Sequence, residues 1–566
     1  MRQAAIAAAA LLIALAASPR DARACGGFFC SQATPIDQTG EKILFTHDAQ
    51  DNQVTYVQVQ FQGSAQDFSW VLPVPGVPTV GVGTDLLFTA LQQSTSPTFN
   101  VDWTTEGECT YQYDDNGYGG ASAGGGGSGG AGGAGGGVEV IASGEVGPYE
   151  WVVLGAADPD ALLAWLADHA FDVTARGQEL LRLYVDGEHN FVAVKLQQNR
   201  GVGDLVPIVL RYSEPLPCVP IRLTAVAARP DLGIHAWVLA DRRAVPLNYY
   251  HVKINEARLD WRYAYYASTE YEDLVSEAVD AAPNGQGFIT EYAGPSDVVN
   301  TMAGYLLDTS RFDLDALRAQ PDVYSYVDTL IGQGLAGTPQ LLAFLTQWIP
   351  LPAELEAQGV TPTDWYNCMA CYEQIAVPFD PVAATADFEA RFVTPLREAA
   401  ELLGSQPYLT KLHTTLDPDE MTLDPYFTFN ADLGDVSNAH SADAYVECGS
   451  SGSWEDAPVR IVTSDGSVIR HPEGVGAYYG GGQQPAGPTA ADAGPAAAIV
   501  EMIGDVGPGQ IIEDNRPAIA DALARGSADV EPDGNCGGCG ATGGASLGGA
   551  FATLSLLGFA RRRQRR

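Results

Sequence analysis

The sequence predicts an α+β fold, in which a β-rich N-terminal domain is followed by a helical middle region and by further short strands. Apolar and polar residues alternate between Lys42 and Phe61, as they do in half-buried strands. Apolar residues then recur at helical spacing within 266–405, and strand-like runs return from about Tyr408. The 566 residues, 46% of them hydrophobic, are enough for two or three domains with their own cores.

The first 24 residues have the features of a signal peptide for export. Arg2 supplies the positive end, and the apolar run Ala4–Ala17 is too short to cross a bilayer comfortably. Residues 22–24 form a small-x-small cleavage pattern, so we expect cleavage after Ala24 and a mature chain that begins at Cys25. Attachment of a lipid to Cys25 is the alternative, but the arginine beside the cleavage point fits a lipid-attachment motif poorly.

The nine cysteines suit a protein that folds outside the cytoplasm, because oxidising compartments favour disulfides. Cys25 and Cys30 enclose two glycines, which give the chain the freedom to close a small loop. Cys368 and Cys371 would close a still tighter ring. The sequence leaves open the pairing of three others, one of which would remain odd: Cys109, Cys218 and Cys448.

A redox role for Cys368 and Cys371 is the alternative to a structural disulfide. A thiol oxidoreductase places such a pair at the N-terminus of a helix that follows a strand, because this position lowers the pKa of the attacking thiol. Here Trp365-Tyr-Asn precedes the pair, and helices are expected before it. The sequence therefore favours a structural disulfide.

Residues 25–265 are predicted to form the β-rich ectodomain, with one amphipathic helix after Asp158. The expected strands lie at 42–61, 68–72, 138–141, 151–154, 191–196, 208–212, 221–226 and 235–239. Pro73 and the prolines that follow it should end the second run, because proline cannot donate to a strand ladder. Trp70 in that run is expected in the core, with an aromatic ligand groove as the alternative.

A segment of almost pure Gly, Ala and Ser, 117–137, interrupts this domain. Such a composition is typical of a flexible loop, and strands are expected on both sides, so we interpret the segment as an insertion within one domain. It contains a Gly-x-Ser-x-Gly pattern at 126–130, which matches the nucleophile elbow of hydrolases. We reject this match because an elbow needs a strand before it and a helix after it.

The first half of the chain carries a series of short, distinctive motifs. They are Cys25-Gly-Gly-Phe-Phe-Cys30, Pro35-Ile-Asp-Gln38, Phe68-Ser-Trp-Val-Leu-Pro-Val-Pro75, Gly144-Glu-Val-Gly-Pro-Tyr149, Thr224-Ala-Val-Ala-Ala228, Val245-Pro246, Asn248-Tyr249, Asn255-Glu256 and Asp260-Trp261. In this order they resemble the bacterial family called domain of unknown function 2330, over about residues 25–300. The Gly-rich insertion is a departure that lies in a loop. The resemblance implies an exported surface protein, and it carries over no catalytic residue.

Residues 266–405 are expected to be helical. A capping box at Thr269 precedes the first apolar face, and Pro395 should kink or divide the last helix. Further helices are expected at 296–307, 321–334, 338–349 and 382–403. Residues 406–480 contain strand-like runs at 426–429, 444–446 and 459–462. Residues 481–540 are rich in Gly, Pro, Ala and Asp, and we interpret them as a disordered spacer with one short ordered segment near Ile511.

The C-terminal tail, 541–566, has the features of a membrane anchor. The apolar run Ala541–Ala560 is long enough to span a bilayer, and the arginines after it would remain cytoplasmic. Together with Cys536 and Cys539, this tail resembles the myxobacterial C-terminal sorting domain. The resemblance implies a processing protease that acts near one of the two cysteines, and attachment at the cell surface. A plain transmembrane anchor is the alternative.

The net charge of −40 makes nucleic acid an unsuitable partner, because an acidic surface repels phosphate backbones. No two of the eight histidines have the spacing of a zinc helix, so no metal ligand and no catalytic residue is predicted. Acidic turns at Asp114–Gly117 and Asn430–Asp435 could hold Ca²⁺, but neither fits the twelve-residue calcium loop. Ca²⁺ is therefore the one cofactor left open.

The sequence favours a noncatalytic protein, exported and anchored at the cell surface, that binds a surface polymer, an envelope protein or cations. An aromatic surface around Trp70 would support this interpretation. The alternative class is an envelope enzyme. It would be either a thiol–disulfide oxidoreductase that uses Cys368 and Cys371, or a hydrolase whose catalytic residues are far apart in the sequence.

Overall fold

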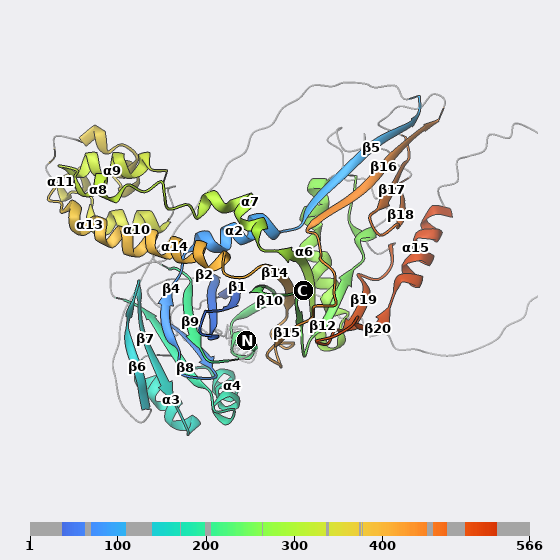
Figure 1. Ribbon diagram of the computed structural model, residues 1–566, viewed down its shortest axis with the longest axis horizontal. Coiled ribbons are helices and arrows are strands. Elements are labelled where there is room, and N and C mark those ends of the chain that lie inside the picture. Colours follow the sequence, from blue (N-terminus) through green and yellow to red (C-terminus); the bar gives the residue numbers. More distant parts are fainter. Residues whose placement is uncertain are drawn as a thin grey trace, which may run out of the picture.

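In the computed structural model, a central sheet of ten strands carries helices on one face, and smaller sheets lie beside it (Figure 1). The structure describes residues 37–62, 69–108, 139–169, 171, 173–197, 205–214, 216–262, 264–334, 339–372, 375, 377–449, 457–471 and 493–528. Several predictions fall outside these residues. They concern the signal peptide 1–24 with Ala24, Cys25, Cys30, Cys109, the turn Asp114–Gly117, the loop 117–137, Cys536, Cys539 and the tail 541–566.

The central sheet combines strands from nearly the whole described chain. Its order is β20 (Gln510–Asp514), β19 (Ala497–Met502), β12 (Tyr250–Ile254), β13 (Gly287–Pro295), β14 (Tyr408–Leu416), β10 (Ala228–Ala240), β1 (Asp37–His47), β2 (Gln53–Gln62), β9 (Ile208–Tyr212) and β4 (Thr79–Val82). The pairs β1–β10 and β12–β13 are parallel, and the other neighbours in this order are antiparallel.

Strand alternation gives the sheet two distinct faces, because successive side chains point to opposite sides. Leu44 pairs with Tyr56 and Trp237, and these three side chains pack against helices. We call this side the helix-covered face; it carries α2 (Asp85–Thr95) and α7 (Asp297–Ala303). The other side, which bears Ile43 and Phe45, is called the cleft face below.

Besides α7, eight α-helices of different lengths form the middle of the described chain. They are α6 (Ala264–Asp280), α8 (Leu314–Arg318), α9 (Val323–Gly332), α10 (Pro339–Trp348), α11 (Ala353–Glu356), α12 (Pro362–Asn367), α13 (Pro381–Phe388) and α14 (Thr394–Leu403). Helices α8 to α13 extend beyond one end of the sheet, at the left of Figure 1. A π-helical turn, Glu389–Val393, separates α13 from α14 just before Pro395, which confirms that this proline divides the last helix.

Three smaller sheets surround the central one. The first is β3 (Ser69–Val74), β8 (Asn190–Leu196), β7 (Tyr149–Gly155) and β6 (Glu139–Val146), with α3 (Pro159–Asp168) and α4 (Ala175–Asp186) beside it. The second is β18 (Val468–His471), β17 (Val459–Thr463), β16 (Ala439–Gly449) and β5 (Thr98–Gly107), which projects at the upper right of Figure 1. The third is the pair β11 (Ala244–Pro246) and β15 (Phe427–Phe429).

Three local predictions are wrong. Pro73 does not end its strand but pairs with Phe191, because β3 is an edge strand that needs no donor on its free side; the strand ends at Val74, directly before Pro75. The run 221–226 forms a short helix, α5 (Ile221–Thr224), since burial of two apolar side chains outweighs its strand propensity. Thr269 lies inside α6 instead of capping it, because that helix already begins at Ala264.

The predicted spacer also proves to be partly folded. Residues 497–528, within the segment 481–540, form β19, β20 and α15 (Arg516–Ala528). Strand β19 pairs with β12, and its Val500 is completely buried. The apolar run Ala497–Met502 is therefore part of the core. Among the described helices, none is long and apolar enough to cross a membrane.

Candidate ligand cleft

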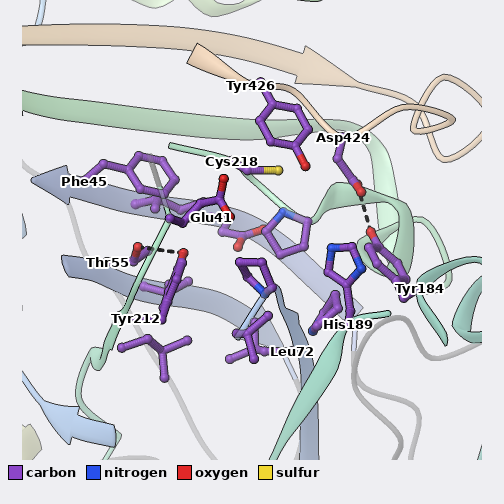
Figure 2. Close-up of a pocket in the computed structure, with 18 residues that line it drawn as sticks. Glu41, Phe45, Thr55, Leu72, Tyr184, His189, Tyr212, Cys218, Asp424 and Tyr426 are labelled. Carbon is purple, nitrogen blue, oxygen red and sulfur yellow. Dashed lines mark hydrogen bonds between the residues drawn. The ribbon is translucent and has the colours of Figure 1, made fainter. Parts of the chain in front are cut away.

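A cleft opens on the cleft face between the central sheet, strand β3 and the segment before β15 (Figure 2). Its cavity volume is about 40 Å³, so the cleft is narrow. Its floor consists of aliphatic and aromatic side chains such as Phe45 and Leu72, and two prolines of the same motif, Pro73 and Pro75, form part of the wall. Polar side chains then converge from elements that are distant in sequence: Glu41, Thr55, Tyr184, His189, Tyr212, Glu214, Cys218, Asp424 and Tyr426.

Glu41 is the buried acid of the cleft. Only 3% of this residue is exposed, and the side chain of Gln38 donates to its Oε2 at 3.3 Å. Loss of hydration raises the pKa of Glu41 to about 7, although the hydrogen bond opposes the shift. At neutral pH a large fraction of this carboxyl is therefore protonated and can donate a hydrogen bond.

Cys218 contributes a thiol to the same cleft, and it is the free cysteine of the described chain. Burial and the negative charge of Asp424 raise the pKa of this thiol far above its usual range, while a hydrogen bond with Tyr426 opposes the shift only in part. Nucleophilic cysteines need the thiolate form. The environment of Cys218 therefore favours an inert, protonated thiol.

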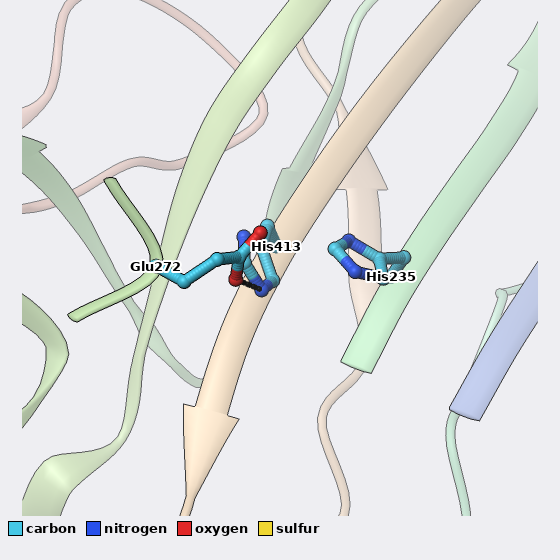
Figure 3. Close-up of side chains that lie close together, drawn as sticks. All are labelled: His235, Glu272 and His413. Carbon is cyan, nitrogen blue, oxygen red and sulfur yellow. Dashed lines mark ion pairs between the residues drawn. The ribbon is translucent and has the colours of Figure 1, made fainter. Parts of the chain in front are cut away.

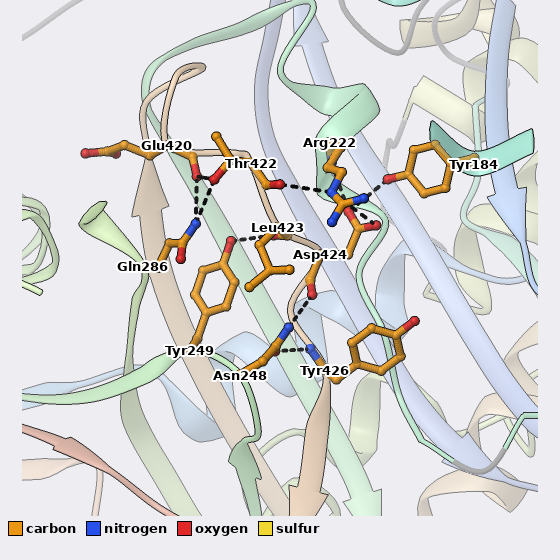
Figure 4. A network of polar contacts seen from close by, with 10 residues as sticks. All are labelled: Tyr184, Arg222, Asn248, Tyr249, Gln286, Glu420, Thr422, Leu423, Asp424 and Tyr426. Atoms are coloured by element: carbon orange, nitrogen blue, oxygen red, sulfur yellow. Dashed lines mark hydrogen bonds and ion pairs between the residues drawn. The ribbon is translucent and has the colours of Figure 1, made fainter. Parts of the chain in front are cut away.

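The segment 420–426 forms the wall opposite the sheet, and Asp424 fixes it on one side (Figure 4). The Asp424 carboxylate accepts hydrogen bonds from the Tyr184 hydroxyl at 2.8 Å and from the Arg222 backbone N–H at 3.1 Å. The Arg222 guanidinium also donates to the Thr422 carbonyl at 3.0 Å. Burial raises the pKa of Asp424 despite these partners.

The side chains of Asn248 and Tyr249 bind the backbone of the segment 420–426 (Figure 4). Asn248 donates to the Asp424 carbonyl and accepts from the Tyr426 N–H, both at 2.8 Å. Tyr249 donates to the Leu423 carbonyl at 2.7 Å. The Asn248-Tyr249 motif noted in the sequence therefore positions the cleft wall and does not itself line the cleft.

Hydroxyl groups give the cleft its remaining polarity. Tyr212 shares a 3.1 Å hydrogen bond with Thr55, and burial raises the pKa of Tyr212 to about 12. His189 lies edge-on to Tyr184, and its buried Nδ1 has no hydrogen-bond partner among the described residues. Such a surface, with hydroxyl groups and carboxyl groups around an apolar floor, suits a ligand that carries hydroxyl groups.

The structure joins Cys368 and Cys371 in a disulfide whose Cα atoms are 5.4 Å apart. Cys368 directly follows the C-terminal end of α12 and directly precedes a short 3-10 turn, Met369–Tyr372, so no strand leads into the pair. The partial negative charge at a helix C-terminus disfavours a thiolate. Trp365, which is fully buried in the helical core, lies one turn before the disulfide. Cys448 is also disulfide-bonded.

The other predicted sites have structural surroundings. Trp70 is only 5% exposed and belongs to the core, so it presents no aromatic groove. In the turn Asn430–Asp435, the Asn430 amide donates to the carbonyls of Gly504 and Gly507. Asp432 accepts from the Gly507 N–H at 2.8 Å. The polar side chains Asn430 and Asp432 therefore hold the turn against residues 504–507.

Sequence reasoning missed one group of side chains that could hold a metal. Among the described residues, His235, Glu272 and His413 bring their ligand atoms within 4.8 Å of one another. They come from β10, α6 and β14, so no local spacing could reveal them. The available signal was the position of two histidines inside apolar strands, in Ile234-His-Ala-Trp237 and Leu412-His413.

The structure is a mixed α+β fold with a partly open cleft that is lined by apolar and hydrogen-bonding side chains. The chain belongs to the bacterial family DUF2330, domain of unknown function 2330, described as an uncharacterized protein conserved in bacteria; the family model matches residues 19–428. The match continues beyond residue 300, where the sequence motifs ended, through the helices and β14. It includes the cleft and the histidine pair. No curated protein and no solved structure matches this chain.

Proposed function

We propose that this protein is an exported, noncatalytic binding protein that is anchored at the cell surface and holds a hydroxyl-bearing unit of a surface polymer in its cleft. The observation that carries the proposal is the combination of protonated or uncharged donors with an apolar floor. Glu41 and Tyr212 can donate to hydroxyl oxygens, and Phe45 and Leu72 can pack against the C–H face of a sugar ring.

The cleft chemistry supports binding more than hydrolysis. The environment of the Cys218 thiol favours its protonated form, and the Asp424 carboxylate is engaged by Tyr184 and Arg222 instead of orienting a histidine. The disulfide Cys368–Cys371 at a helix C-terminus likewise supports a structural role over thiol exchange.

Two sequence features support the cellular location in this proposal. Residues 1–24 match a signal peptide, and the tail 541–566 resembles a sorting domain or a membrane anchor. Deletion of 541–566 should release the protein into the medium, as measured by immunoblotting of cell and medium fractions. A truncated protein that stays on the cells would contradict anchoring by the tail.

Ligand binding can be tested by calorimetry with the purified full-length protein and neutral oligosaccharides released from the surface polymer of the producing bacterium. The proposal predicts that binding weakens as the pH rises above about 7, because Glu41 then loses the proton that it donates. In Glu41→Gln, which keeps a neutral donor, this pH dependence should disappear.

Tyr426→Phe removes a hydroxyl at the cleft and keeps the ring, so it should weaken binding about fivefold to tenfold. Tyr305→Phe is the matched control, since Tyr305 is 63% exposed and does not line the cleft. Equal affinities for the two variants, or a complete lack of saccharide binding, would overturn the assignment of the ligand.

A further inference from the structure

Three side chains that could hold a metal converge on the helix-covered face (Figure 3). His235 on β10 and His413 on β14 are direct partners in the antiparallel pair, and their ring centroids are 4.1 Å apart. Glu272 reaches them from α6, and its Oε2 lies 3.5 Å from the His413 Nε2. Two imidazoles and one carboxylate are thus held together by three different elements.

A second carboxylate orients one of the imidazoles. Glu291, which is 2% exposed, places its Oε1 2.8 Å from the His413 Nδ1, and its Oε2 lies 2.7 Å from the Lys411 Nζ. Since Nδ1 carries the proton for this hydrogen bond, the lone pair of the neutral ring lies on Nε2, toward Glu272. Histidines that bind metals are commonly oriented by an outer carboxylate of this kind.

One nitrogen of each imidazole makes no hydrogen bond in the described chain, although the His413 Nε2 has the Glu272 carboxylate at ion-pair distance. Neither the Nε2 of His413 nor the Nδ1 of His235 makes a hydrogen bond, although both atoms are buried. The His413 side chain has no exposed surface at all, so its Nε2 cannot rely on bulk water. A buried polar atom without a partner is costly and calls for an explanation, and a bound ion would supply one for both nitrogens.

The backbone leaves room beside these nitrogens. Gly233 precedes His235 by two residues and therefore lies on the same face of β10. A Cβ at Gly233 would meet one atom within 4 Å, the His413 Nε2, at 3.9 Å. The side chain of Glu272 is 63% exposed, so an ion can enter from solvent on that side.

We propose that His235, His413 and Glu272 bind a divalent transition-metal ion of the zinc class. Bonds of about 2.0–2.2 Å in a tetrahedral site place the ligand atoms about 3.3–3.6 Å apart, which includes the 3.5 Å between the His413 Nε2 and the Glu272 Oε2. The ligand atoms of the trio lie within 4.8 Å of one another, and rotation of the His235 side chain would bring its nitrogen to the distance that a shared ion needs. Three protein ligands leave a fourth position for water, as in open zinc sites.

The charges around the trio suit such an ion. Lys411 forms an ion pair with Glu291, and Glu272 supplies a carboxylate to the trio, while Lys42 lies on the same face beside His235. Mixed nitrogen and carboxylate ligands are suited to Zn²⁺ and its neighbours, whereas Ca²⁺ and Mg²⁺ prefer oxygen alone. The site is independent of the cleft, which lies on the opposite face of the sheet.

The test is titration of the purified full-length protein, stripped with a chelator, with Co²⁺ followed by Zn²⁺ competition. Visible absorption of bound Co²⁺ should appear at one ion per chain and disappear as Zn²⁺ displaces it. Glu272→Gln, which alters an exposed side chain, should weaken binding at least tenfold. Asp273→Asn, the exposed neighbour on the same helix, is the matched control and should bind normally.

A second variant tests whether the room beside the His413 Nε2 is needed for metal binding. Gly233→Leu should fill the room beside His413 Nε2 and weaken Co²⁺ binding, whereas Gly233→Ala should be tolerated. Affinities that are equal in the wild type, Glu272→Gln and Gly233→Leu would overturn the proposal. The intense near-ultraviolet band of a cobalt thiolate, persisting in Glu272→Gln, would place the metal on cysteines and overturn it as well.

Discussion

Two buried glutamates, one on each face of the central sheet, have pKa values shifted in opposite directions. Glu41 on the cleft face is 3% exposed and Glu291 on the helix-covered face is 2% exposed. The pKa of Glu41 is raised to about 7 because burial removes water and a single amide replaces it. Burial acts on Glu291 too, but Lys411 and His413 outweigh it and hold the pKa well below its usual range.

The strand register explains why the two environments can differ so much within one sheet. Lys42 pairs with His235, which pairs with His413, so these three side chains share the helix-covered face. Glu41, one residue earlier, must point to the cleft face. Within these strands, the sheet therefore keeps the ion-paired Glu291 and the candidate metal ligands on one side and the unpaired acid Glu41 on the other.

The largest loss of stability is expected when Lys411, the ion-pair partner of Glu291 on the helix-covered face, is replaced. Lys411→Met leaves the Glu291 carboxylate buried without its strongest partner, so the free energy of unfolding should fall by about 3–5 kcal/mol. Urea denaturation measures this change. Arg182→Met is the control: it breaks a pair whose side chains are 43% and 75% exposed and should change stability by less than about 1 kcal/mol.

The double change Lys411→Met with Glu291→Gln sharpens this test. It removes both charges, so it should recover part of the lost stability if an unpaired charge causes the loss. If the double variant is less stable than Lys411→Met alone, packing around Lys411 would be the main contribution instead of its charge.

The second largest effect should be a pH dependence of the free energy of unfolding, caused by Glu41 on the cleft face. Its pKa is raised from 4.5 to about 7 in the folded protein, so the unfolded chain binds fewer protons between these values. Stability from this group is then present below about pH 4.5 and is lost as the pH rises through about 7. The total loss should be about 3 kcal/mol.

Glu41→Gln should abolish this loss. The difference in unfolding free energy between the wild type and the variant, from urea curves at pH 4.5 to 8, measures it. A difference that stays constant over this range would show that Glu41 keeps an ordinary pKa. Glu291 should act in the opposite sense, because the stability from its ionised form is lost only as the pH falls below 4.5.

The smallest expected effect concerns the disulfide, which lies in the helical region and borders neither glutamate. Replacing Cys368 and Cys371 by Ser should lower stability by about 2 kcal/mol, mainly because the unfolded chain gains freedom. Since no titrating group is involved, the loss should be the same at every pH. Reduction of insulin by the wild type but not by this variant would instead indicate a redox enzyme.

Much of the fold could be predicted from local patterns. Strands β1, β2, β8 and β10 alternate or run apolar as strands do, and Pro395 does divide its helix. Local patterns failed where tertiary contacts decide the outcome. Pro73 is tolerated because β3 is at an edge, and Ala497–Met502 is folded because it adds a strand beside β12. The place of each strand in its sheet depends on partner strands that are distant in the sequence, so local patterns do not predict it.

The candidate sites were harder to predict, because each combines residues that are far apart in the chain. Glu41 and Asp424 line one cleft, and His235 and His413 meet only because β10 pairs with β14. The sequence pointed to neither group, since its motifs are local. The Asn248-Tyr249 motif was visible in the sequence, but its role as a clamp on the cleft wall depends on where residues 423–426 pass.

The parallel pairing of β1 with β10 has a consequence for synthesis. Gln38 pairs with Ala228, about 190 residues later, and no other strand takes that position beside β1. At about 5–20 residues per second, a ribosome needs about 10–40 seconds to make the intervening chain. During that interval one edge of the apolar run Ile43–Phe45 has no strand partner. This waiting time depends on the order of the strands along the chain, and no increase in the stability of the finished protein can shorten it.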